Sequence, residues 1–306
     1  MSLSLIIPTI GRGEDIKKLL SSFNDQIIKP TEIIIIEQGS KDLEDIATSF
    51  FGLEIKYFYL EKKSLTAARN FGVSKATGDI IGFLDDDIIL DKKYVQNIYT
   101  FFEQHQNALG VQGLITNFVS GHTKKVGGNT TVYFLYNGIA KIFLLNNSSK
   151  TNKLLLSGRN QYASDADKII TCEWLSGIGN YKKQVFDEFT FDESLGGYAL
   201  GEDKLFSYPI QEKYPNSLYL DPNIRCEHHH AEDGRPKGQN WVKMRVYNTW
   251  YLWDTLLAKK GVKAQIAFWW ANIGDIKIAF LGFLLRKNSF MFVVWHICEY
   301  WKLVFK

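Results

Sequence analysis

The spacing of apolar residues along the first 90 positions predicts alternating strands and helices. Short apolar runs, which are typical of buried strands, occupy residues 4–8, 32–36, 55–60 and 79–84. Apolar residues at helical spacing occur between them, at residues 15–23, 42–50 and 64–73, and Ser64 is placed to cap the third helix. This alternation predicts a parallel sheet with right-handed crossovers.

Polar residues directly follow three of these strands, at residues 9–12, 37–40 and 85–87. The carboxyl ends of parallel strands meet at one edge of a sheet, and ligands bind at that edge. We therefore expect the three loops to belong to one site.

The chain becomes less regular after residue 110. Residues 120–128 and 146–167 are polar and rich in Gly, Asn and Ser, which predicts loops, whereas the apolar residues 132–145 predict a helix. A strand is expected at residues 218–221 and a linker at residues 232–239.

Three apolar segments, at residues 241–260, 265–285 and 290–305, predict C-terminal helices. In the second, Asn272 and Asp275 share a face with Gln265, and another face is apolar, with these members: Ile266, Trp269, Trp270, Ile273, Ile276 and Phe280. Trp and basic residues beside an apolar face are typical of a helix at a membrane interface. A core-covering or dimerising helical subdomain fits the pattern equally well.

Composition limits the classes of protein. Hydrophobic residues make up 45% of the 306 positions, which excludes disorder of the whole chain. A net charge of +3 gives no argument for a nucleic-acid partner, and we expect none. The three cysteines are widely spaced, which predicts a reducing compartment and no disulfide framework. With no signal-peptide pattern and no run of about 18 apolar residues, we expect a cytoplasmic protein without a spanning helix.

The triplet of Asp85, Asp86 and Asp87 is the sharpest candidate for chemistry. Alternation along the chain points Asp85 and Asp87 to one side and Asp86 to the other. Two carboxylates on one side suit a hard divalent cation, which would also need diphosphate oxygens and water. An isolated triplet fits a solvated acidic turn better than a metal site. The motifs around the triplet instead favour the metal site over the acidic turn.

Several segments, taken in order, resemble the family 2 glycosyltransferases. They are Pro8-Thr9 after the first strand, residues 36–42 (IEQGSKD), 67–72 (AARNFG), 77–87 (TGDIIGFLDDD) and 201–205 (GEDKL). Each motif is weak alone, but the set is specific and covers roughly residues 3–230. The resemblance implies an α/β fold of the GT-A-like Rossmann type, a mixed sheet flanked by helices, with a helical C-terminal extension.

The resemblance also implies which residues bind the donor, a nucleotide-diphosphate sugar. Thr9 and Glu37 would line the nucleobase and ribose pocket, although the family usually has Asp at the position of Glu37. Arg69 would lie near the diphosphate, and Asp79 would be a buried residue that orders the sugar-nucleotide loop. Alternatively, Arg69 pairs with a local carboxylate and Asp79 belongs to a turn. We also expect Asp86 to be one of the donor-binding residues.

The metal ligands implied by the resemblance are Asp87, Asp85 and His228. Asp85 resembles the ribose- or metal-side carboxylate, and Asp87 the direct ligand. His228 stands where the family has a histidine that helps to hold metal and diphosphate. A neutral imidazole suits Mn²⁺ better than Mg²⁺, and either ion is expected. A separate zinc site with Cys226 is disfavoured, because adjacent histidines do not easily face one ion.

The resemblance assigns the catalytic base to Asp203, with Glu202 binding the acceptor or supporting the loop. Transfer with inversion needs one carboxylate to take the proton of the acceptor hydroxyl. A carboxylate at a helix start is also favoured by the helix dipole alone. Trp174, Ser176 and Gly177 resemble the acceptor-side segment, where Gly177 would allow close approach of a sugar. Trp174 fits sugar stacking and core packing equally well.

Together these observations predict an enzyme of class EC 2.4 that transfers a sugar, with inversion, to a glycan or lipid-linked acceptor in cell-surface glycan synthesis. Residues 1–110 would form the donor half, residues 111–232 the acceptor and catalytic half, and residues 233–306 the helical extension. Peripheral contact with the inner face of the cell membrane and a homodimer are both open. The alternatives are a nucleotidyltransferase that makes the sugar nucleotide, and a non-catalytic glycan- or nucleotide-binding protein at the membrane.

Overall fold

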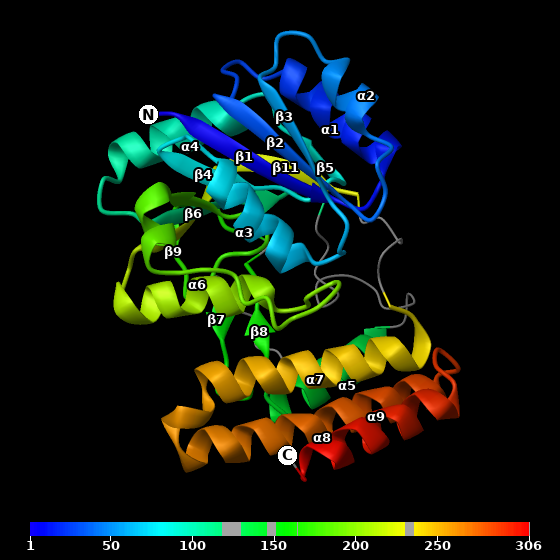
Figure 1. Cartoon of the computed structure of the whole chain (residues 1–306). Coiled ribbons are helices and arrows are strands. Elements are labelled where there is room, and N and C mark those ends of the chain that lie inside the picture. The colour runs from blue at the N-terminus through cyan, green and yellow to red at the C-terminus, as the bar shows by residue number, and fades with distance from the viewer. Residues whose placement is uncertain (118–129, 146–150, 164, 230–235, 306) are drawn as a thin grey trace. The chain divides into compact units, whose positions relative to one another are not determined.

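The computed structural model describes residues 1–117, 130–145, 151–163, 165–229 and 236–305 (Figure 1). The chain forms two compact units, and we describe each by itself. The first comprises Met1–Phe118 and Ser164–Gly234, and the second comprises Val119–Ala163 and Arg235–Lys306. The loop expected at residues 120–128 and part of the linker expected at residues 232–239 lie outside the described residues.

A nine-stranded mixed sheet is the centre of the first unit. Its strands are β1 (Leu3–Thr9), β2 (Glu32–Gln38), β3 (Ile55–Leu60), β4 (Ile80–Phe83), β5 (Ile88–Leu90), β6 (Gly110–Ile115), β9 (Ile170–Thr171), β10 (Asn180–Lys182) and β11 (Leu218–His228). Their order is β3-β2-β1-β4-β10-β6-β11-β5, with β9 beside β11. The first four strands pair in parallel, as the sequence predicts, and β10 is antiparallel to both of its neighbours.

Helices flank this sheet. They are α1 (Gly13–Asn24), α2 (Glu44–Thr48), α3 (Leu65–Lys75), α4 (Tyr94–Gln104), α6 (Glu202–Lys213) and the 3₁₀ turn η1 (Lys183–Asp187). The apolar stripe of α1, with Ile16 and Phe23, is buried as the spacing predicts. Ser64 caps α3, since its hydroxyl accepts a hydrogen bond from the amide of Ala67 at 3.4 Å.

Strand β11 is longer than the strand expected at residues 218–221. It runs to His228, with an irregularity in its pairing to β6 between Leu220 and Arg225. Asp221-Pro222 lies in that irregular part, which explains why the sequence pattern indicated an end there. The extension pairs antiparallel with β5 and places His228 opposite Ile88.

The second unit is mainly helical. Its elements are α5 (Thr130–Ile142), β7 (Lys153–Leu154), β8 (Asn160–Gln161), α7 (Gly238–Leu256), η2 (Ala258–Lys260), α8 (Val262–Leu284) and α9 (Phe290–Leu303). Residues 119–163 thus belong with the C-terminal helices, whereas the sequence analysis grouped them with the second half of the sheet domain. Within this unit, Trp270 donates a hydrogen bond from Nε1 to the carbonyl of Ile142 at 2.7 Å and stacks on Phe143.

Among the described residues, α8 is the one helix that is long and apolar enough to cross a membrane. This finding rests on length and composition alone, and a core helix of a soluble protein passes the same test. The sequence expectation of no such helix counted only uninterrupted apolar runs. Helix α8 contains Asn272, Asp275 and Lys277, which interrupt its apolar run.

Candidate active site

The carboxyl ends of β1, β2 and β4 bring the three predicted loops to one edge of the sheet. The register places Thr9 opposite Glu37, and Ile6 opposite Phe83. Beyond Phe83, the amide of Leu84 still donates to the carbonyl of Ile6 at 3.0 Å, so the acidic triplet begins beside the end of β1. The expected meeting of these loops is therefore observed.

Asp85, Asp87 and His228 come together at this edge. One ligand atom from each lies within 4.8 Å of the others. Nε2 of His228 lies 2.9 Å from Oδ1 of Asp87 and 3.9 Å from Oδ2 of Asp85. The pairing of β11 with β5 sets this geometry, and the amide of His229 donates to the carbonyl of Asp87 at 2.9 Å. Two carboxylates and one imidazole can hold a divalent cation that completes its shell with diphosphate oxygens and water.

Asp86 does not belong to this cluster of three, although Nη1 of Arg12 lies near both Asp86 and Asp87, at 2.7 and 3.9 Å. The carboxylate of Asp86 accepts hydrogen bonds from the hydroxyl of Thr9 at 2.6 Å and from the guanidinium of Arg12 at 2.7 Å. Burial raises the pKa of Asp86 to about 6, against the opposing effect of Thr9 and Arg12. Asp86 thus ties the end of β1 to the acidic triplet. No role for Arg12 follows from the sequence motifs, although its place in the first loop is a usable signal.

Glu37 is fully buried and bonds to the chain itself. Its carboxylate accepts hydrogen bonds from Ser40, from the amides of Asp42 and Leu43, and from the hydroxyl of Tyr57 at 2.6 Å. Burial alone would raise the pKa of Glu37, but these hydrogen bonds outweigh it and lower the pKa. Glu37 therefore shapes the loop after β2. Its predicted contact with the nucleobase stays a prediction.

The expected burial of Asp79 is wrong. This residue is exposed and immediately precedes β4, and its carboxylate accepts hydrogen bonds from the amide and hydroxyl of Ser2, at 2.8 and 2.9 Å. Ser2 precedes β1, which is parallel to β4, so Asp79 lies at the sheet edge opposite the acidic triplet. Its position fits the turn interpretation, in which it ties together the starts of two strands.

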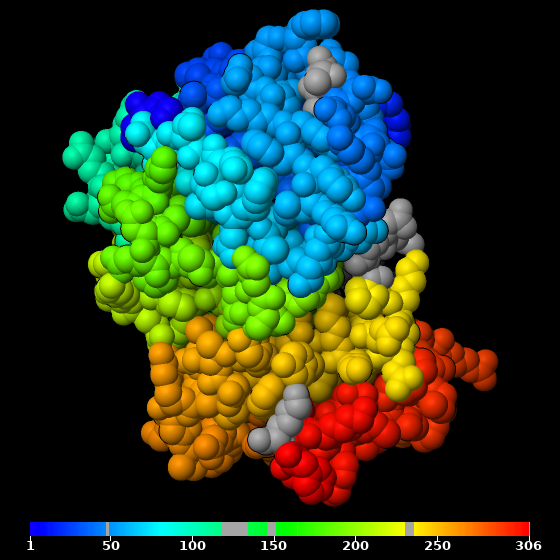
Figure 2. All heavy atoms as spheres, in the orientation of Figure 1, coloured from blue at the N-terminus to red at the C-terminus, as the bar shows by residue number. Residues whose placement is uncertain are grey.

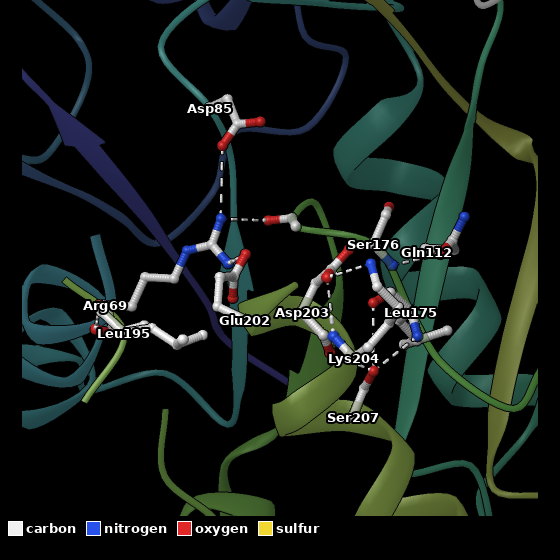
Figure 3. Close-up of polar contacts among 12 residues, drawn as sticks. Arg69, Asp85, Gln112, Leu175, Ser176, Leu195, Glu202, Asp203, Lys204 and Ser207 are labelled. Carbon is white, nitrogen blue, oxygen red and sulfur yellow. Dashed lines mark hydrogen bonds and ion pairs between the residues drawn. The ribbon is translucent and has the colours of Figure 1, made fainter. Parts of the chain in front are cut away.

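Arg69 connects the cluster of Asp85, Asp87 and His228 with the start of α6 (Figure 3). This side chain is 1% exposed, and its guanidinium carbon lies 5.4 Å from the ring centroid of Phe83 and 5.3 Å from that of Phe191. Nη1 lies 2.6 Å from Oε1 of Glu202, while Nη2 lies 3.5 Å from Oδ1 of Asp85. The pairing of Arg69 with local carboxylates, the alternative left open by the sequence, is thus observed. Its charge also lies beside the carboxylate of Asp85.

Glu202 and Asp203 begin α6 but have different surroundings. Burial, together with the charges of Asp203 and Asp85, raises the pKa of Glu202, and Arg69 opposes this effect. Asp203 is partly exposed, and its Oδ1 accepts hydrogen bonds from the amide and the Nζ of Lys204, at 2.9 and 2.7 Å. Glu202 is therefore held by a buried ion pair, and Asp203 is the more accessible of the two carboxylates.

The acceptor-side segment lies against the same helix. Trp174 is 1% exposed, which favours core packing over sugar stacking, and Nζ of Lys204 lies 4.5 Å from its ring centroid. The amide of Ser176 donates to Gln112 at 2.7 Å, a contact that the sequence did not indicate (Figure 3). The carbonyl of Gly177 accepts from Nη2 of Arg69 at 3.1 Å, and an added Cβ would lie 2.9 Å from that nitrogen. Gly177 is thus needed for the close approach of Arg69.

A family model supports the interpretation of these motifs. The model described as Glycosyl transferase family 2 matches residues 4–171, more than half of the 306 residues. This match contains strands β2 to β6, the acidic triplet and Arg69, and it ends before β10, β11 and α6.

Curated relatives include two bacterial glycosyltransferases. Glycosyltransferase GlyA of Streptococcus pneumoniae is 28% identical over 231 residues, which cover 72% of this chain and 30% of GlyA. Poly(ribitol-phosphate) β-N-acetylglucosaminyltransferase TarP of Staphylococcus aureus is 26% identical over 204 residues, which cover 61% of each chain. The present chain therefore spans less than two thirds of the length of either relative.

The fold is also similar to a solved structure, S. aureus TarS 1-349 in complex with UDP-GlcNAc. The TM-score is 0.56 at 15% sequence identity, over 94% of this chain and 77% of that chain. This likeness confirms the expected GT-A-type fold.

Proposed function

Because this chain belongs to glycosyl transferase family 2, we propose that it transfers a sugar from a nucleotide-diphosphate donor to a glycan or lipid-linked acceptor, with inversion at the anomeric carbon. The observation that carries this proposal is the meeting of Asp85, Asp87 and His228 at the carboxyl edge of the parallel strands. We further propose that the protein works in cell-surface glycan synthesis, at the inner face of the cell membrane.

Several residues of the site would have separate roles in binding the donor. Asp85, Asp87 and His228 would hold Mn²⁺ or Mg²⁺, which offsets the charge that develops on the leaving diphosphate. Arg69 supplies a permanent positive charge beside Asp85, at 3.5 Å. Thr9, Arg12 and Asp86 hold the loop after β1 to the acidic triplet. The nucleoside would lie over this loop and the loop shaped by Glu37.

Asp203 would be the general base. Its carboxylate would take the proton of an acceptor hydroxyl as that oxygen attacks the anomeric carbon and the nucleoside diphosphate leaves. Support comes from the partial exposure of Asp203, whose carboxylate pairs with the neighbouring Lys204, whereas Glu202 is buried and paired with Arg69. Glu202 would act as a positioning residue through Arg69, and Ser176 and Gly177 would approach the acceptor.

Release of free nucleotide from sugar nucleotides tests this proposal. UDP-GlcNAc is the first donor to try, since TarS was solved with it and TarP is an N-acetylglucosaminyltransferase by name. We expect Mn²⁺-dependent UDP release that rises when a glycan acceptor is added. Asp203→Asn should abolish the release, and the control Asp79→Asn, at the opposite edge of the sheet, should keep it. Failure of all sugar nucleotides to turn over, with Mn²⁺ and acceptor present, contradicts the proposal.

A further inference from the structure

Helix α8 exposes its large apolar side chains. Six of the exposed apolar residues follow one another at helical spacing and form a stripe: Val262, Ile266, Trp269, Ile273, Phe280 and Leu284. Trp270 is also exposed, and its indole donates a hydrogen bond to the carbonyl of Ile142. The buried side instead carries small or polar residues: Ala264, Ala267, Ala271, Asn272, Gly274, Asp275 and Ala279, with Phe268 as the large exception. A surface helix of a water-soluble domain shows the opposite arrangement, with its apolar stripe towards the core.

Helix α9 repeats this inverted arrangement. Four of its exposed apolar residues are spaced as one stripe that continues past the helix end: Phe290, Ile297, Trp301 and Val304. Met291 and Phe305 are exposed as well. Its buried residues include His296, Glu299 and Tyr300. Helix α9 packs beside α8, and both reach the molecular surface, where they are orange and red in Figure 2. We call the two exposed stripes together the outer apolar face.

Buried polar groups beneath this face are bonded to one another. The carboxylate of Asp275 lies 2.6 Å from Nη2 of Arg159 and 2.8 Å from Nη2 of Arg245. It also accepts a hydrogen bond from the hydroxyl of Tyr300 at 2.6 Å, and Asn272 accepts one from Arg159 at 2.8 Å. Such a paired interior allows the helices to turn their apolar side outwards, as helices in contact with lipid do.

The exposed charges of η2, α8, α9 and the turn that joins the two helices have one sign. From residue 257 onward, the described acidic residues are Asp275 and Glu299, and both are buried. The exposed charged residues in the same range are all basic: Lys259, Lys260, Lys263, Lys277, Arg286, Lys287 and Lys302. Basic side chains beside an apolar surface are attracted to anionic lipid head groups.

We propose that the outer apolar face of α8 and α9 lies in the interfacial layer of an anionic lipid bilayer. The apolar stripes enter the boundary of the acyl chains, Trp269 and Trp301 lie at head-group depth, and the flanking lysines contact the lipid phosphates. This inference deepens the proposed function, on which it rests for the membrane location of the enzyme.

Two other occupants of this face fit less well. A second copy of the chain would place one basic border against another, and like charges repel. A bilayer-spanning α8 would bring the exposed Lys277, which lies within the helix, into the hydrocarbon region. An interfacial position lets the long side chain of Lys277, which lies one turn from Ile273 and from Phe280, extend towards the phosphates.

Flotation of the purified full chain with lipid vesicles tests the proposal. One set of vesicles is pure phosphatidylcholine, and the other contains about 30% phosphatidylglycerol. We expect binding to the anionic vesicles to exceed binding to the neutral ones by about ten-fold and to weaken with salt. The double variant Ile273→Gln, Phe280→Gln should reduce binding by about ten-fold, because both side chains belong to the apolar stripe of α8.

Matched variants separate the contributions. Phe51→Gln removes a side chain of similar size that is 90% exposed in the first unit, and its binding should equal that of the wild type. Lys263→Gln with Lys287→Gln should remove the preference for anionic vesicles. The proposal is overturned if the double variant Ile273→Gln, Phe280→Gln binds as well as the wild type. It is also overturned if the wild type binds neither the anionic nor the neutral vesicles. A lipid-free dimer in sedimentation that this double variant abolishes also overturns it and assigns the face to self-association.

Nucleotide binding in the same preparation separates this proposal from the proposed function. Stabilisation by UDP with Mn²⁺ but no vesicle binding would defeat the membrane inference alone. Vesicle binding without any effect of sugar nucleotides would support membrane binding by the outer apolar face and contradict the proposed function.

Discussion

Arg69 and Glu202 form a buried ion pair, with Nη1 of the guanidinium 2.6 Å from Oε1 of the carboxylate and both side chains less than a tenth exposed. The pair connects α3 to the first residue of α6. Because Nη2 of Arg69 also lies 3.5 Å from Asp85, one guanidinium links the proposed metal ligands to the start of the proposed catalytic helix.

Breaking this pair should destabilise the first unit. Arg69→Met leaves the Glu202 carboxylate buried without its partner, which costs about 3–5 kcal/mol in comparable pairs. Arg69→Met combined with Glu202→Leu should recover much of that loss, since no charge is then left uncompensated. Urea unfolding of the three proteins measures the effect. Lys17→Met, which removes an exposed ion pair with Glu14, is the control and should unfold like the wild type. Equal stability of Arg69→Met and wild type would contradict the buried pair.

The metal cluster should control nucleotide binding. Asp87→Ala and His228→Ala should each weaken Mn²⁺-dependent binding of UDP by about ten-fold or more, because each removes one of the three ligand atoms. Thermal shift with UDP, with Mn²⁺ or with EDTA, measures this change, and EDTA should abolish the stabilisation of the wild type. Asp79→Asn should bind as the wild type does. A nucleotide shift that persists in Asp87→Ala would exclude the cluster as the metal site.

The two carboxylates at the start of α6 should give different kinetic defects. Asp203→Asn should lower kcat by about 100- to 10,000-fold with little change in the KM of the donor, as loss of a general base does. Glu202→Gln should change both parameters, because it releases Arg69 from its position beside Asp85. Steady-state kinetics with the donor that turns over makes the comparison. A normal kcat in Asp203→Asn would mean that another residue is the general base.

The pH dependence of the free energy of unfolding should reflect the ionisation of Glu32. Burial would raise the pKa of Glu32, but hydrogen bonds from Lys56, Ser4 and Thr77 outweigh it and lower the pKa from 4.5 to about 2. A lowered pKa means that the ionised carboxylate stabilises the fold above pH 4.5, and that this contribution is lost as the pH falls towards 2.

Glu32→Gln should therefore be less stable than the wild type by about 1–3 kcal/mol at pH 7, with a gap that narrows between pH 5 and pH 2. Denaturant midpoints across that range test this expectation. The variant Glu14→Gln, at an exposed carboxylate, should show no comparable change. A gap that is constant with pH would mean that Glu32 contributes by packing alone.

Local sequence patterns predicted much of the fold and of the candidate site. The runs that became β1–β4, the stripe of α1 and the cap at Ser64 follow from side-chain chemistry within a few residues. The carboxyl-edge rule for parallel strands then placed Thr9 and the acidic triplet together before any contact was known. These features were predictable because neighbours along the chain determine them.

Only the tertiary structure decided the rest. Whether Asp79 is buried depends on which residues cover the start of β4, and Ser2 meets it there from 77 positions away. The extension of β11 past Asp221-Pro222, which brings His228 to Asp87, depends on pairing with β5. The exposure of the apolar stripe on α8 depends on Arg159 reaching Asp275 from outside the C-terminal helices. Hydrophobic periodicity defines a helix face, but long-range packing determines whether that face is turned inwards or outwards.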